Sequence, residues 1–78
     1  MQEQCIEAIL KYDRNDRPAV NRIIGQLNIT VKRTKSRGFK DYVTVLINDK
    51  TELNILLTTL NKESFWGVVI HKTKIKEK

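Results

Sequence analysis

Apolar and polar positions along the chain follow one order twice. Residues 6–10 and 43–47 are short runs of apolar or alternating residues, which is typical of strands. Each run is followed by a segment with apolar residues at i, i+3, i+4 and i+7, the spacing of a helix with one buried face. Runs rich in β-branched residues then come at 29–31 and 68–70, and we expect the last strand over residues 65–72. The first helical set is Val20, Ile23, Ile24 and Leu27, and the second is Leu53, Leu56, Leu57 and Leu60.

This order of strands and helices predicts an α+β fold of the ferredoxin-like βαββαβ class. We expect a four-stranded antiparallel sheet with both helices on one face. In the usual strand order, 4-1-3-2, the second and fourth strands form the edges. A chain of 78 residues holds a single domain, 1–78. For residues 73–78 we expect a frayed basic tail, although their alternating lysines would also suit an extension of the last strand.

Turn and capping residues separate these elements. The polar segment 13–17 ends before a proline, and Asp16 can cap the first helix. Residues 35–38, Lys-Ser-Arg-Gly, predict the turn of a hairpin. Asp49 is followed three residues later by Glu52, which predicts a capping box at the start of the second helix.

The alternation within the strands assigns their two faces. In the first strand the set with Ala8 and Leu10 should face the helices, and in the third strand the set with Val43, Val45 and Ile47. The open face then carries a mixed, moderately apolar surface, of the kind that a second protein or a second copy of the chain covers. The residues expected at this partner interface are Ile9, Tyr42, Leu46 and Val69.

The 15 basic and nine acidic residues give a net charge of +6, and the positive charge is concentrated in two segments. Residues 32–41 carry a net charge of +4, and residues 72–78 carry +3. Both segments lie at the expected edges of the sheet, where lysines commonly guard against unwanted strand pairing. The alternative is a site for an anion or for nucleic acid.

Candidates for catalytic chemistry are sparse. His71 is the only histidine and reads as a solvent-facing strand residue, while Cys5, the only cysteine, has no base nearby in sequence. The three glycines are too scattered for a phosphate-binding loop. We therefore expect a protein that is not an enzyme and holds no metal or cofactor. The sequence has no signal-peptide pattern and no apolar run long enough to cross a membrane, so we expect a cytoplasmic protein without membrane contacts.

Residues 10–25, LKYDRNDRPAVNRIIG, resemble the start of an ACT domain, in particular that of the small regulatory subunits of acetohydroxyacid (acetolactate) synthase. Residues 45–49 and 56–62 are similar to the third strand and second helix of that family. The resemblance implies a non-catalytic regulatory or accessory subunit of branched-chain amino-acid biosynthesis. Its implied partners are the catalytic subunit of the enzyme, a second copy of the chain, or both.

The ACT resemblance also implies a ligand site, because an amino acid can lie near the turn before the first helix in that family. On this chain the lining residues would be Asp16, Ala19 and Val20, with a branched-chain amino acid as the ligand. Ala19 stands where the family often has glycine, and the connection after the first helix is shorter than in the family. We therefore expect weak binding of the amino acid or none.

Residues 36–45, SRGFKDYVTV, are similar to the central motif of RNA-recognition motifs, with one residue inserted. This second resemblance implies a small RNA-binding protein that uses the basic hairpin between the second and third strands. The open face of the first strand has no aromatic residue for base stacking, so we expect weak, nonspecific, salt-sensitive binding at most. The residues implied are Lys32, Arg33, Lys35, Arg37, Phe39 and Tyr42.

Overall fold

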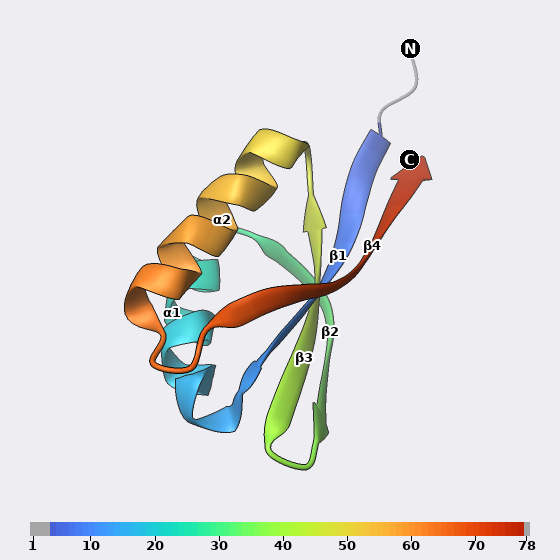
Figure 1. Cartoon of the computed structure of the whole chain (residues 1–78). Coiled ribbons are helices and arrows are strands. Elements are labelled where there is room, and N and C mark those ends of the chain that lie inside the picture. The colour runs from blue at the N-terminus through green and yellow to red at the C-terminus, as the bar shows by residue number, and fades with distance from the viewer. Residues whose placement is uncertain (1–3, 78) are drawn as a thin grey trace.

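The computed structural model describes residues 4–77, with the side chains of residues 5–75. The four strands form one antiparallel sheet in the order β2-β3-β1-β4, and both helices cover the same face of it (Figure 1). The predicted ferredoxin-like βαββαβ arrangement is therefore confirmed. In chain order the elements are β1 (Gln4–Asp13), the 3-10 turn η1 (Arg14–Asp16), α1 (Arg17–Gln26), β2 (Thr30–Arg37), β3 (Lys40–Ile47), α2 (Lys50–Glu63) and β4 (Val68–Glu77).

The core lies between the helices and the face of the sheet that they cover. The residues that alternation assigned to this face, Ala8 and Leu10 on β1 and Val43, Val45 and Ile47 on β3, are all buried. Each helix adds one stripe of three buried side chains, out of the four that its 3.6-residue period predicts. These are Val20, Ile23 and Ile24 from α1 and Leu53, Leu56 and Leu60 from α2. The fourth residue of each set departs from the prediction, since Leu27 is exposed and Leu57 is half-buried.

The helix ends follow the capping signals only in part. Helix α1 ends before Leu27, which is exposed, and Asn28 with a φ of 54° then turns the chain toward β2. Helix α2 begins as predicted, because the Asp49 carboxylate accepts a hydrogen bond of 2.8 Å from the backbone N–H of Glu52. The reciprocal bond of the predicted capping box would join the Glu52 carboxylate to the backbone N–H of Asp49. The Glu52 carboxylate instead accepts a hydrogen bond from the Asn48 side-chain amide.

The hairpin between β2 and β3 turns two residues later than predicted. Arg37 pairs with Lys40, so Gly38 and Phe39 form the turn, and residues 35–37 belong to β2. Gly38 has a φ of 62°, which glycine adopts without strain. The prediction was wrong here because every residue of β2 is exposed, so no pattern of burial marks the end of the strand.

Strand β4 begins and ends later than predicted. Phe65 and Trp66, expected in the strand, lie in the loop before it. The strand runs from Val68 to Glu77 and pairs with β1 on both sides of one irregularity. Residues 73–77 therefore extend the strand instead of forming a frayed tail, and only residue 78 of that segment lies outside the described residues.

Candidate functional site

A bulge in β2 adds positive charge to the face of the sheet that the helices leave open. Val31 pairs with a buried residue of β3 on the helix side, and Arg33 pairs with Thr44, so Lys32 is an extra residue in β2. The Lys32 amine donates a hydrogen bond of 2.7 Å to the Glu7 carboxylate of β1. Two consecutive cations, Lys32 and Arg33, therefore reach the open face, which strict alternation would not allow.

A bulge in β4 brings His71 to the same face. Lys72 pairs with Ile9, and Ile70 pairs with the next residue of β1, so His71 is the extra residue in β4. Its ring lies edge-on to the Tyr42 ring of β3, with centroids 5.1 Å apart and planes at 70°. The sequence predicted a solvent-facing residue without a role at His71. No feature of the sequence marks the bulge that brings it to Tyr42.

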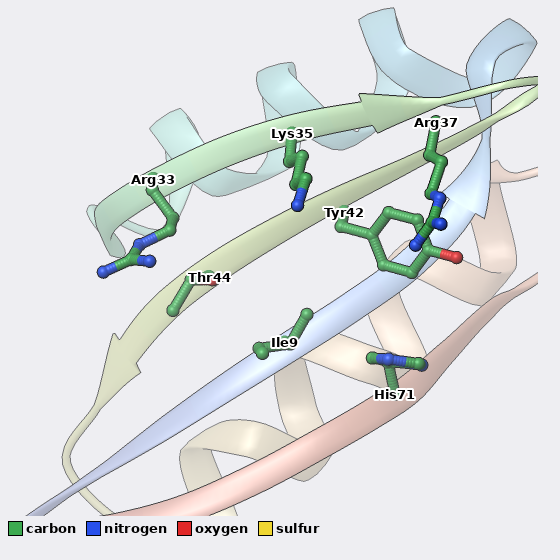
Figure 2. Close-up of a pocket in the computed structure, with 7 residues that line it drawn as sticks. All are labelled: Ile9, Arg33, Lys35, Arg37, Tyr42, Thr44 and His71. Atoms are coloured by element: carbon green, nitrogen blue, oxygen red, sulfur yellow. The ribbon is translucent and has the colours of Figure 1, made fainter.

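The open face holds a hollow of about 310 Å³ between the two edge strands (Figure 2). Three basic side chains at alternate positions of β2 project over it, and the two central strands form its floor. A mixed apolar and aromatic floor beside a line of cations favours an extended anionic ligand. The lining residues are Ile9 from β1, Arg33, Lys35 and Arg37 from β2, Tyr42 and Thr44 from β3, and His71 from β4.

Positive charge on the open face extends beyond this hollow. The described carboxylates on the face are both paired, Glu7 with Lys32 at 2.7 Å and Asp13 with Lys40 at 4.0 Å. Two such faces would repel each other if they were packed together, so an acidic partner suits this face better than a second copy of it. The further cations that strand pairing puts on the face are Lys11, Lys72 and Lys74.

Most of the residues implied for nucleic-acid binding come together in the structure. Arg33, Lys35, Arg37 and Tyr42 all line the open-face hollow, and Lys32 lies on the same face in contact with Glu7. Phe39 is the exception, because it lies in the turn of the hairpin, 82% exposed, and does not line the hollow.

The four residues predicted at a partner interface share the open face. Ile9 and Tyr42 form part of the floor of the hollow and are half-buried. Leu46 is also half-buried, and Val69 is exposed near the outer edge. These side chains make the face partly apolar, but the cations around them dominate its electrostatic character.

The residues predicted to line an amino-acid site at the turn before α1 have other contacts. Asp16 is only 2% exposed, and its two carboxylate oxygens accept hydrogen bonds from the backbone N–H groups of Phe65 and Trp66, at 3.0 and 3.1 Å. Asp16 stands at the N-cap of α1, yet the predicted capping bond is absent. Val20 is buried in the core and Ala19 is half-buried. The Asp16 carboxylate therefore holds the loop between α2 and β4.

An ion pair joins β3 to the start of α1 on the other side of the sheet. Asp41 is 4% exposed, and its carboxylate accepts hydrogen bonds from Arg17 Nε, from Arg17 Nη2 at 2.9 Å and from the Ser36 hydroxyl at 2.8 Å. The Arg17 guanidinium holds the pKa of Asp41 below its usual range. Burial, helped by the nearby Asp41 charge, raises the pKa of Tyr12. Hydrogen bonds join the side chains of Arg17, Ser36 and Asp41 to one another, so we assign them a structural role.

Metal-binding clusters and membrane-spanning helices are absent from residues 4–77. Within residues 4–77, no three His, Cys, Asp or Glu side chains lie close enough together to hold a metal ion. Cys5 is a buried free thiol. Neither helix is long and apolar enough to span a membrane. The open-face hollow is the site with the clearest chemical character.

No family model and no curated protein matches the chain. Solved structures with the same fold include the C-terminal domain of the MgtC protein from Mycobacterium tuberculosis, with 13% identity and a TM-score of 0.60 over 97% of this chain and 88% of that one. They also include the uncharacterized protein TM1266 from Thermotoga maritima, with 16% identity and a TM-score of 0.55 over 99% and 98% of the two chains. At these identities the similarity shows the ferredoxin-like fold alone, and the ACT resemblance stays a prediction.

Proposed function

We propose that this chain is a non-catalytic binding module whose open sheet face takes an extended anionic partner. The observation that carries the proposal is the line of Arg33, Lys35 and Arg37 beside a floor that contains Tyr42. Among the described residues, none of the three cations has an acidic partner in an ion pair. Like charges on one strand repel each other, and a bound anion would relieve that repulsion.

Protection of a sheet edge explains only part of this arrangement. Lysines on an edge strand discourage pairing with another chain wherever they point. Edge protection does not require a bulge that turns Lys32 and Arg33 to one face, nor a histidine brought across to Tyr42 from the opposite edge. Both features concentrate charge and ring surface over the centre of the open face, which supports a binding role.

Titration of the chain with inorganic polyphosphate tests this proposal. We expect binding that weakens steeply as salt is added, because counterions are released from the polymer. The double variant Lys35→Gln/Arg37→Gln should bind at least about tenfold more weakly at low salt. The matched control, Lys50→Gln/Lys62→Gln, removes the same charge from α2 and should bind like the parent chain. Equal losses in both variants would mean that net charge alone determines binding, and would overturn the proposal.

A second candidate function is that of an accessory subunit of a metabolic enzyme, with the catalytic subunit of acetolactate synthase as the partner. The half-buried apolar side chains of Ile9 and Leu46 on the open face favour it, as does the ACT resemblance of residues 10–25. The surrounding cations would then pair with an acidic surface of the catalytic subunit.

Co-elution with a purified acetolactate synthase catalytic subunit, together with the activity of the mixture, tests this second candidate. We expect a complex whose activity differs from that of the catalytic subunit alone. Leu46→Asp should prevent its formation, because the substitution places a carboxylate against an acidic partner surface. Separate elution and unchanged activity would exclude this enzyme as the partner.

A further inference from the structure

We infer that the anionic partner is a single-stranded nucleic acid, with its phosphates along the cations of β2 and a base stacked on Tyr42. The inference rests on the proposed function, because it names the ligand class of the same face. It depends on two features that occur together in the open-face hollow, a row of cations along one strand and an aromatic surface beside it. Proteins that bind single strands without sequence preference combine these two features.

The cations of β2 suit a ligand with regularly repeated charge. Arg33, Lys35 and Arg37 occupy alternate positions of an extended strand, so neighbouring Cα atoms lie about 6.6 Å apart and the line spans roughly 13 Å. A compact anion could reach only part of this length. A phosphate backbone offers a charge at every nucleotide and can meet the whole line.

The aromatic surface comes from two strands that are not neighbours. Tyr42 lies on β3 and His71 on β4, and their ring centroids are 5.1 Å apart across β1, which lies between these strands (Figure 2). The edge-on histidine supports the tyrosine ring from one side. β1 has no aromatic residue on the open face, so the second ring of the site comes from His71 on β4.

The ring surface distinguishes single strands from other polyanions. A duplex keeps its base faces inside the helix, so it could meet the cations but not stack on Tyr42. Polyphosphate carries charge without bases. Ring stacking accepts any base, because every base has a flat face, so the expected preference for sequence is small.

Fluorescence anisotropy with the full chain tests the inference. The probes are fluorescein-labelled oligouridylate and oligothymidylate of 12 nucleotides, a 12-base-pair duplex, and inorganic polyphosphate as competitor. We expect single strands to bind at least about tenfold more tightly than the duplex. Tyr42→Leu keeps an apolar side chain in the floor, and should weaken single-strand binding about fivefold or more while leaving polyphosphate binding unchanged. Tight binding of the RNA strand alone, or of both single strands, supports the inference.

Two outcomes would contradict it in different ways. If Tyr42→Leu binds the single strands as the parent does, and polyphosphate competes as well as they do, base stacking is excluded and only the general polyanion proposal stands. If neither polyphosphate nor the oligonucleotides bind at low salt, both proposals fail.

A measurement on the parent chain avoids dependence on the folding of a variant. Stacking of a base should move the NMR signals of the Tyr42 and His71 ring protons as oligouridylate is added. Shifts confined to lysine and arginine side chains would overturn the inference.

Discussion

The two faces of the sheet are made by the same strands and differ in packing and charge. On the covered face, Ala8 and Val45 pair with each other and are buried under the helices. On the open face, the neighbouring pair Ile9 and Thr44 forms the floor of a charged hollow. The covered face therefore supplies most of the stability, and the open face carries the proposed binding site. Substitutions should separate the two properties.

The largest effect is expected on the covered face. Leu56 is 0% exposed, and Leu56→Ala should leave a cavity that costs about 2–5 kcal/mol of unfolding free energy. A domain of this size has little more stability than that, so the variant should be largely unfolded. Urea unfolding followed by circular dichroism measures the loss. The control is Ile55→Ala on the same helix, where the parent residue is 53% exposed and the expected loss is below about 1 kcal/mol.

The covered face is also the part of the molecule that the sequence predicts best. Buried apolar residues alternate along β3 at Val43, Val45 and Ile47, and they recur every three or four residues along α2, so the apolar pattern reports the fold directly. The open face has no such pattern. Every residue of β2 is exposed, and that is why the hairpin turn was predicted two residues too early.

The features that the sequence did not predict depend on contacts between distant residues. Asp16 bonds to Phe65 and Trp66, which lie 49 and 50 positions further along the chain, and local capping rules gave its carboxylate a different partner. His71 reaches Tyr42 only because β4 contains a bulge against β1. The sequence predicted the cations of the hollow together with Tyr42 and put Ile9 on the open face, but it gave His71 no place in this site.

The second-largest loss of stability is expected at Asp16, a charged residue that is as deeply buried as the core residues. Both oxygens of Asp16 accept backbone hydrogen bonds, so Asp16→Asn would turn an amide N–H₂ toward an N–H donor. We expect a loss of about 2–3 kcal/mol, again measured by urea unfolding. The control is Asp49→Asn, because asparagine caps a helix about as well as aspartate. Equal small losses would contradict the assigned role of Asp16.

A smaller and pH-dependent effect is expected at the ion pair between the sheet and α1. The pKa of Asp41 is lower in the folded chain than in the unfolded one, so its charge stabilises the fold above the ordinary carboxyl pKa of about 3.9. That stabilisation is lost as the pH falls through the lower, folded-state pKa. Asp41→Asn should therefore cost about 1–2 kcal/mol at neutral pH and progressively less as the solution becomes more acid than pH ~4.

Unfolding curves of parent and Asp41→Asn across this pH range measure the difference. The control is Glu63→Gln, which breaks a half-exposed pair with Arg22 and should change stability by less than about 0.5 kcal/mol at any pH. A constant difference between parent and Asp41→Asn at every pH would show that the carboxylate charge contributes nothing.

The smallest effect on stability is expected on the open face, where the effect on binding is the largest. Lys35 and Arg37 are exposed and have no acidic partner in an ion pair among the described residues, so Lys35→Gln/Arg37→Gln should change the free energy of unfolding by no more than about 0.5 kcal/mol. A slight gain is expected, because two like charges on one strand are removed. The same protein should lose at least about tenfold in polyanion affinity at low salt. Urea unfolding and titration on one preparation measure both quantities. If the variant lost stability as well as binding, the cations of β2 would help to hold the sheet together. That result would contradict the assignment of stability to the covered face and of binding to the open face.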